Sequence, residues 1–368
     1  MTGLYIHVPF CRSKCLYCDF YSVRPDDGVA ELYIQAVLKA AEPYRDEKID
    51  TVYFGGGNPL LLGAGNLCRL ADGLNGIFAL EQNSEITLEA NPEDVTPEAA
   101  KTLFDGGFNR ISIGVQSLDD EVLKKLGRRH DAKQAITAIE AVFAAGFRHI
   151  SADLMLSLPD ASPEKDKETA KELCGLPLDH ISAYMLKVEQ GTPFAGMNLN
   201  LPDEDSAADS YLAVCEILKE NGFAQYEISN FAKPGGKSRH NLKYWTLEPY
   251  IGLGPAAHSF YGGKRFYYPR DLAGFLQSPQ KTVSDGEGGN AEEKIAMALR
   301  LSEGIAMDEL KRLLGENGYQ NLEKPLRDWV KNGLATETGG RFALTSKGFL
   351  VSNSIISRIL LESDEVKS

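Results

Sequence analysis

Short apolar runs and helix-length amphipathic segments alternate along the chain from its amino terminus to about residue 230. The runs that predict strands are Leu4–Val8, Thr51–Phe54, Glu85–Ala90, Arg110–Val115, His149–Met155 and Ile181–Leu186. Segments with helical periodicity lie between them, among them Ala30–Tyr44, Pro97–Asp105 and Lys133–Ala145. Such alternation predicts an α/β fold with a parallel sheet and right-handed crossovers. The six units could form a partial barrel or an open doubly wound sheet, and periodicity alone does not decide between the two.

The pattern changes after residue 230. Residues 231–290 are rich in Gly, Pro, Tyr and His, and the stretch Ser284–Asn290 has the composition of a linker. Helical patterns follow at Ala291–Glu303, Met307–Leu314 and Asn321–Asn332, with a hairpin pattern at Leu334–Leu344. We therefore expect three parts: residues 1–230 as the α/β unit, 231–290 as a connecting segment, and 291–368 as a mostly helical, winged-helix-like module.

The 368 residues carry a formal net charge of −13. Because a phosphate backbone attracts basic surfaces, this charge argues against a nucleic-acid partner. No apolar run approaches the roughly 20 residues that span a bilayer, so we expect no transmembrane segment. The amino terminus lacks the basic and apolar regions of a secretion signal, which predicts a protein of the reducing cytoplasm.

Three cysteines lie within eight residues, in Cys11-Arg-Ser-Lys-Cys15-Leu-Tyr-Cys18, directly after the first predicted strand. In a cytosolic chain of this size, such a density indicates metal binding or redox chemistry rather than a disulfide framework. Three thiolates can ligate three irons of a cubane cluster, which leaves the fourth iron open to a small molecule. A structural zinc site needs four ligands, and no further residue completes a usual zinc pattern. We predict a [4Fe–4S] cluster on Cys11, Cys15 and Cys18, with zinc or an inert thiol group as the alternative.

Glycines and polar residues occur at the ends of the next strands, where a barrel gathers its ligands. The segment Gly55–Pro59 follows the second strand, and its glycines let a ligand approach the backbone closely. Glu89, Gln116 and Asp153 lie in or just after the third, fourth and fifth strands. A carboxylate accepts hydrogen bonds from hydroxyl groups, and an amide both donates and accepts. Each residue alone could be an ordinary polar group, but their repetition at successive strands favours one shared site.

The CxxxCxxC spacing after the first strand of a β–α repeat resembles the radical S-adenosylmethionine superfamily. The resemblance implies a partial (β/α)6 barrel whose open iron binds S-adenosylmethionine and whose cluster supplies the electron that cleaves the sulfonium. It also implies the cofactor-binding residues Tyr5, Tyr17 (through its main chain), Gly56, Gly57, Asn58, Glu89, Gln116, Arg128 and Asp153. The usual motif of that superfamily is Gly-Gly-Gly-Thr-Pro, and this chain has Asn58 in place of the threonine.

A second resemblance rests on the region after residue 225 and extends over nearly the whole chain. The motif His240-Asn241-Leu-Lys-Tyr244-Trp245 and the run Tyr250–Ser259 are similar to the oxygen-independent coproporphyrinogen III oxidase family, whose C-terminal module is of the HemN type. Dehydrogenases of that family carry a further cysteine where this chain has Phe20, and they have an extension before the first strand. Both departures favour the haem-chaperone branch.

The resemblance implies that the chain binds haem, a [4Fe–4S] cluster and S-adenosylmethionine. A neutral imidazole can ligate haem iron, which makes His240 the candidate ligand and His258 the second candidate. Structural hydrogen bonding by His240 is the alternative. The chain would deliver haem to an acceptor haemoprotein, for which membrane-bound respiratory enzymes are candidates, and no residue receives a catalytic role. The rival functions are a coproporphyrinogen III dehydrogenase and an adaptor whose cofactor site only stabilises the fold, and a homodimer stays an open option.

Overall fold

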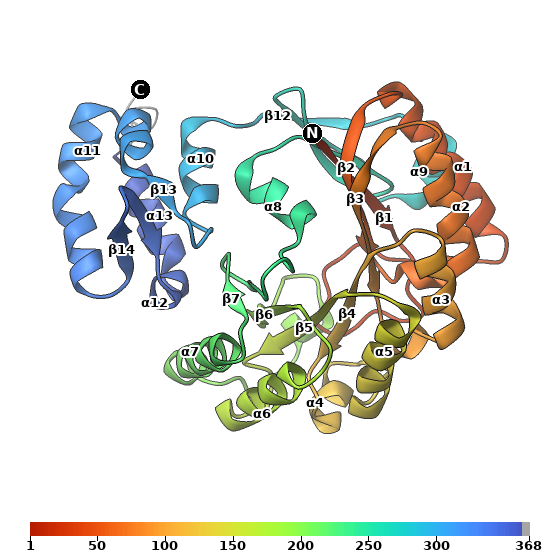
Figure 1. The fold of residues 1–368 in the computed structure, drawn as a ribbon, viewed down its shortest axis with the longest axis horizontal. Helices are drawn as coiled ribbons and strands as arrows, with labels where there is room; N and C mark the ends of the chain where they lie inside the picture. Colours follow the sequence, from red (N-terminus) through yellow and green to blue (C-terminus); the bar gives the residue numbers. More distant parts are fainter. Residues whose placement is uncertain (363–368) are drawn as a thin grey trace.

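A curved sheet of twelve strands, covered by helices on its outer face, dominates the computed structural model, which describes residues 1–362 (Figure 1). Six parallel strands pair in sequence order at its centre: β1 (Thr2–Val8), β2 (Lys48–Gly56), β3 (Ala79–Ala90), β4 (Arg110–Gln116), β5 (His149–Leu156) and β6 (His180–Met185). The six predicted strands are confirmed. The sheet order is linear, from β12 at one edge to β7 at the other, so the barrel is a partial one.

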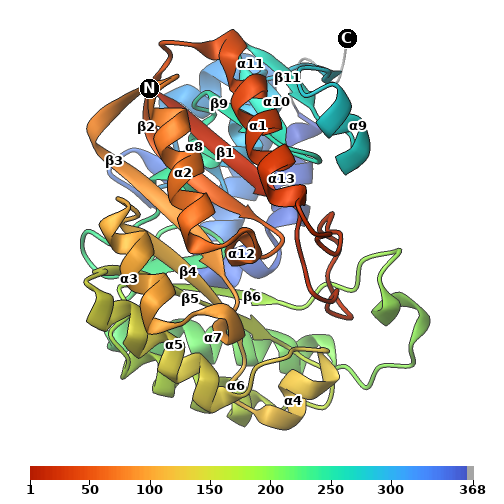
Figure 2. The same cartoon turned by 90° about the vertical axis from the view of Figure 1, so that its right-hand side faces the viewer.

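The crossovers between these strands carry the outer helices, which Figure 2 shows side by side over the sheet. They are α1 (Val29–Ala41), α2 (Ala64–Asn75), α3 (Pro97–Asp105), α4 (Asp120–Lys125), α5 (Ala132–Ala145), α6 (Pro163–Cys174) and α7 (Glu204–Glu220). Short 3-10 turns are η1 (Glu42–Tyr44), η2 (Pro59–Leu62), η3 (Pro92–Asp94) and η4 (Pro193–Gly196). Local signals set the helix ends: the Thr96 hydroxyl accepts a hydrogen bond from the Ala99 N–H at the start of α3, and Gly146 ends α5 with φ of 122°.

The two faces of the central strands have opposite character. Leu4, Ile6 and Val8 of β1 pack into the main hydrophobic core, which lies between the sheet and the outer helices. Polar side chains alternate with apolar ones along the strands and line a cavity of about 260 Å³ on the inner face, as Ser151 and Asp153 do in β5. The apolar face of the sheet therefore packs against the helices, and the opposite face lines the interior of the barrel with polar side chains.

Residues 231–290 extend the same sheet at both ends. β8 (Asn230–Ala232) pairs with β6 and with β7 (Ala224–Gln225), while β9 (Tyr250–Leu253) pairs in parallel with β1. Three antiparallel strands follow: β10 (His258–Tyr261), β11 (Lys264–Tyr267) and β12 (Val283–Glu287). The same segment contributes α8 (Arg239–Thr246) and α9 (Leu272–Gln277).

The linker prediction for Ser284–Asn290 is wrong over most of its length. Residues up to Glu287 form the edge strand β12, which pairs with β11 through a register shift. Gly286 has φ of 84°, so the glycines serve an irregular exposed strand rather than a free connection.

A second, smaller hydrophobic core organises the C-terminal module, which lies beside α7 and α8 (Figure 1). Its elements are α10 (Ala291–Ala298), β13 (Ile305–Ala306), α11 (Met307–Lys331), β14 (Ala335–Thr338), β15 (Arg341–Leu344), α12 (Ser346–Leu350) and α13 (Ser352–Leu360). The predicted hairpin is confirmed, while α10 ends before the predicted Glu303. α11 consists of two helices, as expected before the hairpin, and they are separated at Gly315, whose φ of 71° is not helical. Within residues 1–362, no helix combines the length and apolarity that crossing a bilayer requires.

Candidate cofactor site

The three cysteines lie on the loop after β1 and line one cavity of about 140 Å³ at the carboxyl ends of the strands. Backbone hydrogen bonds fix this loop: the Cys11 N–H donates to the Val23 carbonyl at 2.9 Å, and the Leu16 N–H donates to the Leu126 carbonyl at 3.1 Å. Leu16 also packs on a small apolar cluster that includes Leu126 and Phe194. Backbone hydrogen bonds and apolar packing therefore fix the position of the loop that carries the thiols.

A half-buried cation, Arg128, lines the same cavity as the thiols. Arg128 Nη1 lies 3.6 Å from Cys15 Sγ, and Nη2 donates to the Gly114 carbonyl at 2.7 Å and to Asn91 Oδ1 at 3.0 Å. Burial raises the pKa values of the Cys11 and Cys18 thiols. A fixed positive charge opposes that effect, because it stabilises thiolate over thiol. The loop therefore places its thiols beside a positive charge.

The glycines after β2 give the cavity its second wall. An ideal Cβ at Gly57 would lie 2.7 Å from the Phe10 carbonyl oxygen, and one at Gly56 would lie 2.5 Å from the His7 ring. Gly56 also has φ of 104°, a conformation that side chains rarely adopt. No other residue fits these two positions without movement of the backbone or of a buried ring.

Two half-buried carboxylates line the cavity from β3 and β5. Glu89 accepts hydrogen bonds from the Tyr53 hydroxyl at 2.7 Å and from the Gly56 N–H at 2.9 Å, and burial raises its pKa to about 7. Asp153 accepts from the Ser112 hydroxyl at 3.1 Å, and burial raises its pKa to about 6. Both groups thus have spare acceptor capacity toward a hydroxyl-rich or cationic ligand.

Gln116 ends β4 with φ of 67°, a strained conformation for a residue with a side chain, and it lines the same cavity. Its Oε1 accepts a hydrogen bond from the Tyr184 hydroxyl at 3.2 Å. Tyr184 of β6 and Asn91, the partner of Arg128, were missed by the sequence prediction. Asn91 follows Glu89 by two residues at a strand end, which is a signal that could have found it, whereas the orientation of Tyr184 carries no local signal.

Two predicted residues lie outside this cavity. Tyr5 lines a neighbouring cavity of about 340 Å³ together with His258, and its hydroxyl is 3.0 Å from His7 Nδ1. Asn58 is buried, and its amide donates to Asp94 at 2.6 Å, while Asp94 also accepts from Arg12 at 2.9 Å on the cysteine loop. Asn58 therefore supports the loop from behind rather than facing the thiols.

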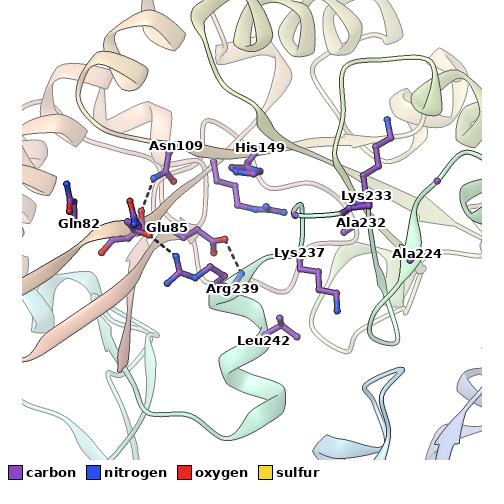
Figure 3. Close-up of a pocket in the computed structure, with 16 residues that line it drawn as sticks. Gln82, Glu85, Asn109, His149, Ala224, Ala232, Lys233, Lys237, Arg239 and Leu242 are labelled. Atoms are coloured by element: carbon purple, nitrogen blue, oxygen red, sulfur yellow. Dashed lines mark hydrogen bonds between the residues drawn. The ribbon is translucent and has the colours of Figure 1, made fainter. Parts of the chain in front are cut away.

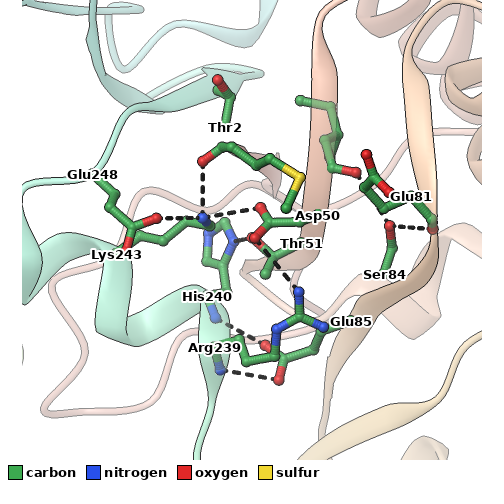
Figure 4. Close-up of polar contacts among 12 residues, drawn as sticks. Thr2, Asp50, Thr51, Glu81, Ser84, Glu85, Arg239, His240, Lys243 and Glu248 are labelled. Atoms are coloured by element: carbon green, nitrogen blue, oxygen red, sulfur yellow. Dashed lines mark hydrogen bonds and ion pairs between the residues drawn. The ribbon is translucent and has the colours of Figure 1, made fainter.

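His240 sits in a closed polar network at the start of α8, shown in Figure 4. Its Nδ1 is 2.8 Å from the Thr51 hydroxyl, its Nε2 is 2.8 Å from the Tyr244 hydroxyl, and its ring stacks on Tyr53. The side chain is fully buried, and burial lowers its pKa to about 3, so the imidazole is neutral. Since both ring nitrogens are engaged, this geometry does not support the prediction that His240 ligates haem iron.

Ion pairs and a charged hydrogen-bond acceptor hold the residues around His240 in place. Lys243 lies 2.9 Å from both Asp50 and Glu248, and the Glu85 carboxylate accepts the backbone N–H groups of Arg239 and His240 at 3.0 and 2.9 Å. The motif around His240 therefore fixes the first turn of α8 against β2 and β3.

The donor set around the thiol cavity fits an iron–sulfur cluster with an adjoining cosubstrate. Three thiols share the cavity with a half-buried arginine, two carboxylates and a glycine wall that leaves the backbone open. Within residues 1–362, no group of three or more His, Cys, Asp or Glu side chains is arranged to hold a single metal ion. A cubane cluster has a different requirement, because its thiolates bind separate irons.

Comparison with known proteins agrees with this geometry. Residues 5–173 match the model of the radical SAM superfamily, and residues 290–351 match that of the HemN C-terminal domain. The solved structure of Escherichia coli coproporphyrinogen III oxidase (HemN), described as a radical SAM enzyme, superposes with a TM-score of 0.83 at 21% identity, covering 97% of this chain and 89% of that one. At that identity the likeness shows the fold.

Relatives with the name "Heme chaperone HemW" align over the full length. The Lactococcus lactis protein is 32% identical over 98% of both chains, and the Escherichia coli protein is 34% identical over 98% of both. The Mycobacterium tuberculosis protein is 35% identical over 97% of this chain and 94% of its own. The chain therefore belongs to the HemW family of the radical SAM superfamily.

Proposed function

We propose that this chain is a haem chaperone that binds haem and passes it to an acceptor haemoprotein. The observation that carries the proposal is the full-length identity of 32–35% to proteins named as haem chaperones in three bacteria. The acceptor class that we propose is the membrane-bound respiratory haemoproteins, served by a chaperone located in the cytoplasm.

The proposal includes a [4Fe–4S] cluster on Cys11, Cys15 and Cys18, with S-adenosylmethionine beside it. When bound, the cluster supplies single electrons. Arg128 favours the thiolate forms of the cysteines, and Gly56 and Gly57 give a ligand access to the backbone. Glu89, Asp153 and Gln116 offer acceptors to ribose hydroxyls from three successive strands. We propose that this site tunes haem transfer rather than turning over a substrate.

The central experiment measures haem transfer by the anaerobically reconstituted full-length protein. Holoprotein loaded with one equivalent of haem is mixed with haem-depleted respiratory membrane vesicles, and recovery of the haem b spectrum is followed with and without S-adenosylmethionine. We expect faster recovery than from free haem, and a rate that changes with S-adenosylmethionine. A recovery rate equal to that from free haem under both conditions would refute the chaperone function.

The rival dehydrogenase function is tested with coproporphyrinogen III, a reductant and S-adenosylmethionine. We expect no sustained formation of protoporphyrinogen IX, and multiple turnovers would overturn the proposal. A Cys15→Ala variant tests the ligand set in parallel. It is expected to lose the cluster absorption and the matching iron and sulfide, whereas Cys68→Ala, which replaces a half-buried cysteine outside the loop, keeps them.

A further inference from the structure

A large cavity lies at the opposite end of the barrel from the cysteines (Figure 3). Its volume is about 710 Å³, against about 140 Å³ for the thiol cavity, and the two share no lining residue. Its walls come from the amino-terminal parts of β3, β4 and β5, the strands β7 and β8, the loop at 233–237 and helix α8. A volume of this size suits an organic ligand, since such sites commonly enclose about 300–1,000 Å³.

One histidine on this cavity has a free ring nitrogen. His149 begins β5, and its Nδ1 lies 2.6 Å from Asp179 Oδ2. Asp179 is itself held, because its Oδ1 accepts the Ile150 N–H at 2.8 Å. Within residues 1–362, His149 Nε2 has no hydrogen-bond partner, and the side chain is 47% exposed. A carboxylate on one ring nitrogen with the other nitrogen free is the arrangement that orients a histidine for metal ligation.

The cavity is basic, although the chain as a whole has a net charge of −13. Besides His149, its charged lining residues are Arg110, Lys233, Lys237, Arg239 and the single acid Glu85. The Glu85 carboxylate accepts two backbone N–H groups of α8, and the Arg239 guanidinium lies 3.5 Å from Asp50. Among the described residues, Arg110, Lys233 and Lys237 are the lining cations without an ion-pair partner.

Among these cations, Arg110 gives the clearest indication of an anionic ligand. It is 3% exposed, its Nη1 donates to the Gly236 carbonyl at 2.9 Å, and its Nη2 is buried without a hydrogen-bond partner in the described structure. An unpaired buried guanidinium group is costly, and an anionic ligand would satisfy it.

Apolar surface completes the wall. Ala224, Ala232, Pro234 and Leu242 line the cavity between the cations. Leu242 and Arg239 belong to the same helix as His240, so the histidine-containing motif forms one wall of this cavity while His240 itself turns toward Thr51.

We propose that this basic cavity is the haem site, with His149 Nε2 as the axial ligand and the cations Arg110 and Lys237 facing the propionates. A flat apolar macrocycle with two carboxylates and an iron matches the three features on the walls: apolar side chains, cations and one free imidazole nitrogen. A phosphate ligand would use the cations alone. The inference rests on the proposed function and assigns it a site that lies away from the thiol loop.

The test is titration of the cluster-loaded full-length protein with haemin, followed by absorbance difference spectra and compared with iron-free protoporphyrin IX. For Asp179→Asn we expect haemin affinity to fall by about tenfold, because second-shell partners of metal ligands are commonly worth that much. For His149→Ala we expect a larger fall and loss of the spectrum of a histidine-ligated iron, with protoporphyrin IX affinity unchanged. Lys237→Glu should weaken both porphyrins.

Matched controls separate this site from its alternatives. Lys264→Glu reverses an exposed charge on β11 and should bind haemin as the wild type does. His258→Ala removes the second histidine candidate, which is exposed and outside the cavity, and a loss of haemin affinity in this variant would overturn the assignment to His149. Cluster content, read at the other end of the barrel, reports whether each variant is folded.

The outcomes distinguish the two proposals. Wild-type protein that does not bind haemin would overturn the chaperone function together with this site. Normal haemin affinity and spectrum in folded His149→Ala and Lys237→Glu would overturn the site alone. Equal loss of both porphyrins in His149→Ala would rule out the iron–imidazole bond. If Lys237→Glu abolished binding of inorganic phosphate but left both porphyrin affinities unchanged, the cations would belong to a phosphate site instead.

Discussion

Replacement of Gly56 by alanine tests the physical reason for the glycine run beside the cysteines. The new Cβ would lie 2.5 Å from two atoms of the His7 ring. That ring cannot easily yield, because it is buried and its two nitrogens lie 3.0 Å from the Tyr5 hydroxyl and the Tyr21 carbonyl. The backbone adds a second cost, since φ at Gly56 is 104°.

Both costs can be estimated. A left-handed backbone costs an L-residue about 1–2 kcal/mol, and overpacking in a closed site costs about 1–3 kcal/mol. Gly56→Ala should therefore lower the free energy of unfolding by about 2–5 kcal/mol. It should also weaken S-adenosylmethionine binding, because the Gly56 N–H holds the Glu89 carboxylate at 2.9 Å.

Two neighbouring glycines separate the two costs. Gly63 has φ of 91° and ψ of 137° but no atom closer than 3.9 Å to an added Cβ, so Gly63→Ala should show only the backbone cost, which is about 1–3 kcal/mol for such a conformation. Gly65 lies in α2 with open space and ordinary φ, so Gly65→Ala should be neutral or stabilising by up to about 1 kcal/mol.

The assay is urea unfolding of the reduced apoprotein, with midpoints compared at equal slope. If Gly56→Ala lost no more stability than Gly63→Ala, the clash with His7 would be refuted.

Three further predictions follow from the site. S-adenosylmethionine affinity should fall as the pH drops from 8 to 5.5. Over this range Glu89 and Asp153, whose pKa values are raised to about 7 and about 6, become protonated and lose acceptor capacity. A flat pH profile in calorimetric titration would contradict this prediction. Asp94→Ala should lower the cluster content after reconstitution, because it frees Arg12 and Asn58 behind the cysteine loop, whereas Asp72→Ala on the outer helix α2 should not. Glu85→Gln should lower the free energy of unfolding by about 1–3 kcal/mol in urea, because the charged acceptor of two N–H groups at the start of α8 is lost. A loss of stability no larger than that of Glu81→Gln, which replaces an exposed glutamate, would count against this prediction.

Local sequence signals were sufficient for the order of the barrel elements and for the cluster loop. Apolar alternation located six strands to within a few residues of their ends, except for the early start of β3, because burial imposes its periodicity on every strand. The spacing of Cys11, Cys15 and Cys18 needs no tertiary information, since one short loop carries all three thiols. The carboxylates at successive strand ends were found by the same logic, because parallel strands bring their carboxyl ends to one edge.

Only the tertiary structure decided which of these side chains face the thiols. Arg128 lies 113 positions from Cys15 in the chain, and Tyr184 lies 68 from Gln116, so no local pattern records either contact. Asn58 follows the glycine run but lies outside the cavity, because its amide donates a hydrogen bond to the half-buried carboxylate of Asp94.

The histidines show the same division between sequence and structure. The sequence singled out His240 by its motif, whereas it gave His149 only as the first residue of a predicted strand. Both ring nitrogens of His240 are hydrogen-bonded, one to Thr51 and the other to Tyr244. Within the described part of the chain, His149 has only Nδ1 paired, with Asp179, so its other nitrogen is free to face the basic cavity. A motif identifies residues that lie close together in the sequence. The availability of a nitrogen lone pair depends on neighbours that are distant in sequence, and only the folded chain brings those neighbours into contact.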